Sequence, residues 1–273
     1  MYDMTAAPFW NNGEKRDYSN LADLAVEGMN AGTPQIYAPS FTNYVEGIYV
    51  GYRFYETAAE EGILDYDKAV QYPFGYGLSY TTFEQKMGEL KEQDGELSVD
   101  VTVTNTGNTA GKDVVELYYH PPYTNGGIEK ASVNLADFAK TDLLEPGESQ
   151  TITVTVAIED MASYDYQKEK AYVLEEGEYL LSANSDSHTI LDQKTYTVDQ
   201  TIVYHGDNKR ASDEIAAVNV FEDAAGDVTY LSRADGFANL AEATKAPVTT
   251  ELEEPYVSEY HLNSNFDKRT YLN

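Results

Sequence analysis

The chain has 273 residues, 42% of them hydrophobic, and a formal net charge of −29 at pH 7 from 47 acidic and 18 basic side chains. A surface with this much negative charge repels phosphate backbones and anionic lipid headgroups. Nucleic acids and membranes are therefore not expected as partners. Cysteine is absent, which excludes disulfides, thiolate metal sites and cysteine nucleophiles. The sequence shows no apolar run long enough to cross a membrane and no secretion signal, so a cytoplasmic location is favoured.

Residues 1–83 are rich in Gly, Pro, Asn and aromatic residues and show little regular alternation. The stretch from Ser19 to Gly28 has apolar residues at i, i+3, i+4 spacing, which predicts a helix. The region has too little pattern to form a complete domain. Its aromatic side chains are therefore expected to pack on the following domain, to be covered by the tail after residue 200, or to drive association. The residues concerned are Tyr49, Tyr52, Phe54 and Phe74.

Residues 96–199 contain four segments in which apolar and polar residues alternate. They run from Leu97 to Val103, Val115 to Tyr119, Ile152 to Ile158 and Tyr179 to Ala183. A period of two gives each strand one buried and one solvated face. Turn signals rich in Gly, Asn and Pro separate the segments, so the pattern predicts a two-sheet sandwich. The side chains expected in its core include Val101, Val103, Val115, Ile152, Val154 and Leu181.

After residue 200 the alternation fades. Val228, Tyr230 and Leu231 indicate one more short strand. Beyond Ala234 the chain is rich in Thr, Glu and Asn and carries two prolines, which is typical of a linker or of the approach to another domain.

Two motifs resemble signatures of glycoside hydrolase family 3. The first is Tyr44–Tyr55, YVEGIYVGYRFY, and the second is Tyr72–Phe83, YPFGYGLSYTTF. Val101–Gly107 and Leu144–Ser149 are similar to the fibronectin type III-like domain that follows in that family. Val228–Asp235 resembles the connector of members in which the catalytic barrel comes last.

The resemblance implies a mainly β fold: a fibronectin type III-like, immunoglobulin-like β-sandwich preceded by a remnant of an α/β sandwich domain. The expected division is 1–83 for the end of the α/β domain, 84–200 for the sandwich, and 201–273 for a connector towards a missing barrel. The parent would be a bacterial, β-glucosidase-like enzyme that hydrolyses O-glycosyl bonds with retention. This piece would be a non-catalytic scaffold whose partners are the remaining catalytic domains and, through them, a β-linked glycoside.

No catalytic residue is assigned in this chain. The resemblance places the nucleophile on the barrel and the acid/base glutamate in a segment before Tyr44, where Glu14 and Glu27 match no recognisable motif. Glu46 is the one candidate for substrate binding, although pairing with Arg53 or accepting backbone N–H groups is favoured for it. The four histidines lack metal-ligand spacing, so neither a metal nor a cofactor is expected.

The alternative function is a stand-alone module that binds carbohydrate or protein. Such a module would show a row of exposed aromatic rings on one face. Strand alternation buries some of the candidates, which leaves no obvious platform. The candidates are Tyr118, Tyr119, Tyr123, Tyr164, Tyr166 and Tyr172.

Overall fold

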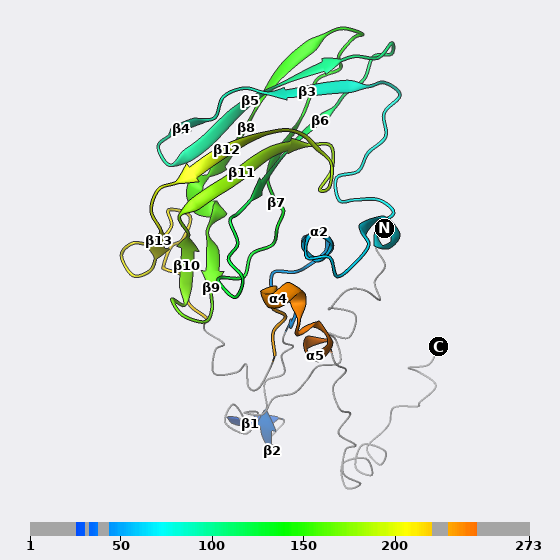
Figure 1. The fold of residues 1–273 in the computed structure, drawn as a ribbon. Coiled ribbons are helices and arrows are strands. Elements are labelled where there is room, and N and C mark those ends of the chain that lie inside the picture. Colours follow the sequence, from blue (N-terminus) through cyan, green and yellow to red (C-terminus); the bar gives the residue numbers. More distant parts are fainter. Residues whose placement is uncertain (1–25, 31–32, 38–43, 220–228, 245–273) are drawn as a thin grey trace.

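The computed structural model describes residues 26–30, 33–37, 44–219 and 229–244. Side chains are described only for 44–219 and 229–244. Figure 1 shows a β-sandwich with a small helical layer beneath one end of it. Within the described residues, none of the helices is both long and apolar enough to cross a membrane.

The first sheet of the sandwich is built around the longest strand, β5. It comprises β3 (Phe83–Met87), β4 (Lys91–Gln93), β5 (Glu96–Asn105) and β8 (Ser149–Ala157). The strand β8 pairs antiparallel along one edge of β5, while β3 and β4 share the other edge. Val99 opposes Val154 across this pairing, so the apolar faces of β5 and β8 coincide.

The second sheet is also antiparallel, in the order β12-β11-β6-β7. A third, smaller sheet in the order β13-β10-β9 closes one end of the sandwich. The second sheet comprises β6 (Val114–His120), β7 (Asn134–Lys140), β11 (Gly177–Asn184) and β12 (Ile190–Val198), and the third β9 (Ser163–Asp165), β10 (Ala171–Leu174) and β13 (Ile202–Tyr204). A short 3₁₀ turn, η3 (Ile158–Met161), links β8 to β9.

The main core lies between the two large sheets, as the alternation predicts. Of the six side chains expected there, five are buried and one, Ile152, is half-buried and packs against the core. The mainly β fold and the sandwich are thus confirmed. The five buried residues are Val101, Val103, Val115, Val154 and Leu181.

A second, smaller core forms around helix α2 (Tyr52–Glu60). Its buried members include Phe54, Tyr55 and Ala58, which lie on one face of the helix at helical spacing. Tyr49 and Val70 flank the helix in sequence and belong to the same core. The remaining members come from beyond residue 229, where α4 (Ala234–Phe237) lies beneath α2 and is followed by α5 (Leu240–Ala243) (Figure 1). Helix α3 (Tyr66–Ala69) is a single helical turn and lies between α2 and α4 in the sequence.

The aromatic residues of the N-terminal region are covered from two sides. Tyr49 and Phe54 contact Phe237, with ring centroids 4.9 and 5.9 Å apart. Tyr52 stacks on Phe74 and meets Tyr118 of the sandwich edge-on at 6.2 Å. The tail thus covers Tyr49 and Phe54, and the sandwich partly covers Tyr52, whereas Phe74 stays 43% exposed.

Two local expectations are wrong where the structure describes them. Of the helix predicted from Ser19 to Gly28, residues 26–28 belong to strand β1 (Val26–Asn30), which pairs with β2 (Thr33–Tyr37), and residues 19–25 lie outside the described residues. Only two residues, Ala31 and Gly32, separate these strands in the sequence, a hairpin spacing that outweighs the short apolar period. The second expectation is the short strand at 228–231. Its described residues, Thr229 to Leu231, do not pair with any strand, and Leu231 instead packs in the small core.

Candidate functional site

The sandwich, helix α2 and the tail meet at the buried carboxylate of Glu129. This residue lies in the loop between β6 and β7 and is 9% exposed. It accepts hydrogen bonds from Tyr49 Oη at 2.5 Å, from Ser232 Oγ at 2.5 Å and from the backbone N–H of Arg233 at 2.9 Å. Three donors satisfy a buried carboxylate, so Glu129 joins three distant parts of the chain. Burial and the neighbouring Glu129 carboxylate raise the pKa of Tyr49 far above its ordinary value, which keeps the phenol a donor.

Arg233 extends this junction to the end of α2. Its guanidinium, 4% exposed, donates from Nε to Glu61 at 2.5 Å and from Nη2 to Glu60 at 2.8 Å. Its Nη1 donates to the carbonyl of Lys130 at 3.2 Å, and its Cζ lies 4.2 Å from the centre of the Tyr123 ring. A planar guanidinium can make all these contacts at once, whereas the single ammonium of a lysine could not.

A second polar contact fastens the other side of α2 to the sandwich. Glu56, 6% exposed, accepts from Tyr66 Oη at 2.5 Å and from Ser187 Oγ at 2.8 Å. Its other oxygen lies 2.8 Å from His188 Nδ1. The His188 ring stacks on Tyr66 with centroids 3.8 Å apart. Helix α2 is therefore held on the sandwich by charged and neutral hydrogen bonds as well as by apolar packing.

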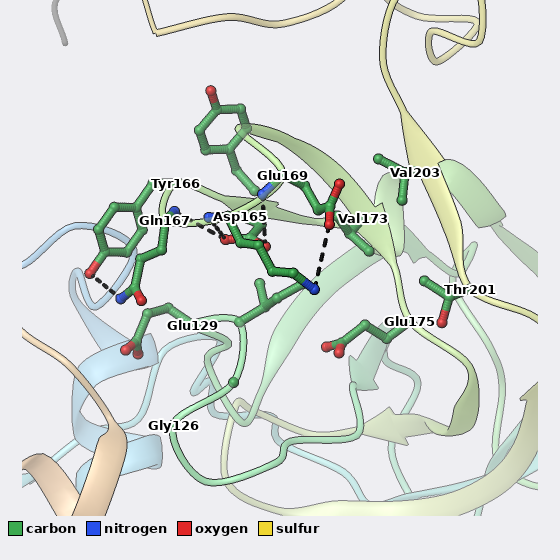
Figure 2. Close-up of a pocket in the computed structure, with 14 residues that line it drawn as sticks. Gly126, Glu129, Asp165, Tyr166, Gln167, Glu169, Val173, Glu175, Thr201 and Val203 are labelled. Carbon is green, nitrogen blue, oxygen red and sulfur yellow. Dashed lines mark hydrogen bonds and ion pairs between the residues drawn. The ribbon is translucent and has the colours of Figure 1, made fainter.

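A pocket of about 310 Å³ opens next to this junction, at the end of the sandwich (Figure 2). One wall is the end of β9 with the turn that leads to β10, from Tyr164 to Glu169. The opposite wall is the loop with Gly126 and Glu129. Asp165 shapes the turn, because its carboxylate accepts three backbone N–H bonds, from Gln167, Lys168 and Glu169. The remaining wall is formed by β10 and the residues leading into β13, including Val173, Glu175, Thr201 and Val203.

A second hollow of about 510 Å³ adjoins the first and shares Glu129, Tyr164 and Tyr166 with it. Its other walls are mostly apolar and include Ile48, Tyr49, Val218, Tyr230 and Leu231. The two hollows follow the line along which the sandwich meets the smaller core.

Glu46, the candidate for substrate binding, is 3% exposed. It lies in a turn in which its backbone carbonyl accepts from the N–H of Tyr49 at 2.9 Å. The lining of the larger hollow begins at the next residue, Gly47. Burial at this level fits the structural role better than direct contact with a sugar, but a role for Glu46 in binding stays untested.

Other residues singled out from the sequence are dispersed. Arg53 has a buried Nε atom without a hydrogen-bond partner among the described residues. His120 lies 3.0 Å from Ser182 Oγ, and burial lowers its pKa. The described residues contain no group of three His, Asp or Glu side chains placed to hold a metal. Glu14 lies outside the described residues, and Glu27 falls in β1, where side chains are not described.

The tyrosines considered as a carbohydrate platform do not form one flat exposed row. Tyr118 is fully buried, and Tyr119, Tyr123, Tyr164 and Tyr172 are partly buried. Tyr166, at 39%, is the most exposed of them, and with Tyr164 it lines the pocket.

Sequence reasoning missed the central residue of the junction. Glu129 lies 80 residues from Tyr49 and 104 from Arg233 along the chain, so no local motif announces their contact. Arg233 falls inside the motif at 228–235 that resembles a connector, which was the one available signal.

The family comparison agrees with this structure. Residues 113–187 match the model of the fibronectin type III-like domain. The chain is 41% identical over 182 residues to β-glucosidase A of Butyrivibrio fibrisolvens, covering 60% of this chain and 21% of that protein. It is 40% identical over 164 residues to a β-glucosidase of Ruminococcus albus, covering 59% of this chain and 16% of that one.

Solved structures give the same result. A Kluyveromyces marxianus β-glucosidase superposes with a TM-score of 0.52 at 34% identity, over 59% of this chain and 18% of that chain. The family 3 β-glucosidase of Bifidobacterium adolescentis gives 0.50 at 33% identity, over 58% and 22%.

The fold and the matched domain define a mainly β protein built on a fibronectin type III-like sandwich. About three fifths of the chain is homologous to family 3 β-glucosidases, which confirms the resemblance found in the sequence. The chain spans about a fifth of the length of the relatives it matches.

Proposed function

We propose that the chain is a non-catalytic portion of a β-glucosidase-like family 3 hydrolase, in which it supports the catalytic domains and fixes their relative position. The observation that carries the proposal is the junction at Glu129 and Arg233, which ties the sandwich to α2 and to the tail. A scaffold needs such a rigid connection, because catalytic groups must be held within a fraction of an ångström of their working geometry.

The buried carboxylates of the junction support a structural role. A retaining glycosidase needs two carboxyl groups about 5–5.5 Å apart that are free to act on the sugar. Glu129 and Glu56 are instead engaged by two or more donors of the protein itself. In the proposal, the nucleophile and the acid/base glutamate belong to parts of the parent enzyme other than the described residues.

The proposed domain division stays at 1–83, 84–200 and 201–273. Two observations refine it. Strand β13 (Ile202–Tyr204) pairs with β10 and so completes the small sheet of the sandwich. Leu231, Phe237 and Ala243 share one core with α2, so the connector region forms part of the junction. The proposed partners are the remaining domains of the parent and, through them, a β-linked glycoside.

Activity is the first test. The purified chain is expected to release no product from aryl β-glucosides above the level of a buffer control. Turnover that disappears on substitution of an acidic residue of this chain, starting with Glu46→Gln, would overturn the non-catalytic assignment.

Rigidity is the second test. The wild-type chain is expected to melt in one cooperative transition. Arg233→Ala leaves two glutamates without their partner and should separate an earlier transition of the small core from that of the sandwich. Lys68→Ala removes an exposed ion pair with Asp65 and serves as the control that should leave the melting curve unchanged. Two separate transitions already present in the wild type would contradict a rigid scaffold.

A further inference from the structure

We propose that the pocket between the β6–β7 loop and the β9–β10 turn (Figure 2) binds a neutral saccharide unit without cleaving it. This inference adds a binding function to the scaffold role and does not depend on it. The pocket lies between elements of the sandwich, namely residues 126–129, residues 164–169, β10 and the segment from Thr201 to Val203.

The size of the pocket suits one sugar ring. Its volume of about 310 Å³ is at the lower end of the range of small-molecule sites, which is roughly 300–1,000 Å³. The walls are preformed, because Asp165 fixes the turn through three backbone N–H groups and Tyr164 Oη donates to the carbonyl of Lys170. A preformed wall reduces the ordering cost of binding.

The charges that face the pocket are already compensated within the protein. Glu129 is satisfied by Tyr49, Ser232 and the Arg233 N–H, and Glu175 pairs with Lys130 Nζ at 2.5 Å. The carboxylate of Asp165 is occupied by backbone N–H groups, and Glu169 lies 3.6 Å from Lys168 Nζ.

Such a lining holds no surplus cation to attract an anionic ligand, and the acidic surface of the chain repels one. It also leaves no buried unpaired carboxylate that would call for a basic ligand. A neutral ligand is therefore favoured over an ion of either sign.

The chemistry of the lining matches the two-sided character of a pyranose, which has C–H faces and hydroxyl edges. Ile128, Val173 and Val203 offer apolar surface, and Tyr164 and Tyr166 add aromatic surface. Lys168 and Glu169, which are exposed on the turn, offer a donor and an acceptor to hydroxyl groups. The pocket thus supplies the stacking surface that the flat faces of the sandwich lack.

Binding can be measured by NMR titration of the whole chain with glucose and with cellobiose at millimolar concentrations. Shifts are expected at residues 126–129 and 164–169. Tyr166→Ala should weaken binding about tenfold by removing an aromatic ring from the lining. The matched control is Tyr80→Ala, since Tyr80 is 98% exposed and lies outside the pocket, and it should bind like the wild type.

A second variant guards against an indirect effect of removing the Tyr166 ring, which also contacts Tyr230. Glu169→Ala changes an exposed side chain of the turn and should also weaken binding, with no change in melting temperature. Shifts confined to other parts of the chain, or equal affinities for Tyr166→Ala and the wild type, would overturn the proposal.

The choice of ligand is tested separately. Glucuronate should bind more weakly than glucose, because the acidic surface of the chain repels its carboxylate and the lining holds no surplus cation to pair with it. Binding of a lysine-rich peptide in the same pocket without any binding of glucose or cellobiose would overturn the assignment to a saccharide. The two proposals fail separately. Failure to bind sugar would overturn the saccharide site and leave the scaffold role intact. Hydrolysis of an aryl glucoside would contradict the non-catalytic scaffold role and leave the saccharide site intact.

Discussion

Gly75 shows how one residue fixes the path between the small core and the sandwich. Its φ of +86° lies in the left-handed region, and a Cβ atom placed there would come within 2.3 Å of Glu116 Oε2. The adjacent Phe74 carbonyl accepts from the N–H of Ser187 at 2.8 Å, which holds the segment against the second sheet. Gly75 thus sits where a side chain would not fit, while Gly77 has open space around it.

The two glycines provide a matched test. Gly75→Ala should destabilise the chain by about 1–2 kcal/mol, because a left-handed backbone disfavours any Cβ atom and the carboxylate of Glu116 stands in its way. Gly77→Ala should change stability little. Urea unfolding of both variants measures the difference, and equal effects would show that the backbone at residue 75 is not constrained.

Glu116 itself gives the chain a pH dependence. Burial raises the pKa of this carboxyl, with further contributions from Asp186 and Asp113, although a hydrogen bond from Tyr118 Oη opposes the shift. The folded state therefore holds the proton more tightly than the unfolded state does. Stability falls as pH rises from the ordinary glutamate pKa to the raised value, and it stays lower at neutral pH.

Replacing the carboxyl should remove this loss. Glu116→Gln keeps an acceptor for Tyr118 and carries no charge, so its melting temperature should exceed that of the wild type at neutral pH. At acidic pH, where Glu116 is protonated in both states, the two proteins should melt together. A variant that is less stable than the wild type throughout the pH range would show that the carboxylate, once buried, is a net stabilising group.

At the scale of the strand, periodicity is a reliable guide where a strand has one face in the core. The sequence predicts the central strands β5, β6 and β11, and in β5 buried side chains alternate with more exposed ones. In β6 and β11 runs of four consecutive residues, 115–118 and 181–184, are buried, because other parts of the chain cover the outer face there. The edge strands β7 and β12 escaped prediction, because their outward positions mix polar and apolar residues, with Phe138 65% exposed and Leu191 45% exposed. An edge strand owes its conformation to its neighbour more than to its own pattern.

The alternation in β5 can be tested directly. Val101→Ala removes two methyl groups from a fully buried position and should cost roughly 1.5–3 kcal/mol in the free energy of unfolding. The adjacent Thr102 is exposed on the other face, so Thr102→Ala should have a much smaller effect. Comparable losses in the two variants, measured by chemical denaturation, would contradict the assigned faces.

At the scale of the molecule, the chain closes a second core from pieces about 180 residues apart in sequence. The N–H of Leu231 donates to the carbonyl of Val45 at 2.7 Å, and Phe237 enters the ring cluster of α2. Sequence patterns could indicate that the aromatic residues needed a cover. They could not identify Glu129 or Phe237 as the residues that provide it, because such pairs share no local periodicity.

Phe237 is held in this cluster by an uncommon backbone. Asp235, Gly236 and Phe237 have consecutive φ values of +52°, +65° and +58°, a left-handed turn that a bulky residue adopts only when its surroundings compensate the strain. The compensation is burial, since Phe237 is 3% exposed and meets both Tyr49 and Phe54 edge-on. The side chain therefore links the stability of the tail to that of α2.

Phe237→Ala should release this link while sparing the sandwich. Truncating a buried phenylalanine costs about 3–5 kcal/mol, a loss that falls here on the small core around α2. Hydrogen exchange followed by mass spectrometry should then show faster exchange in residues 52–60 and 231–243 and unchanged protection in β5. Phe138→Ala, at an exposed ring on β7, is the matched control and should leave exchange in α2 as in the wild type. Unaltered protection of α2 in Phe237→Ala would mean that the sandwich alone holds the helix, through Glu56, Thr57 and Tyr52, and that the tail contributes nothing to it.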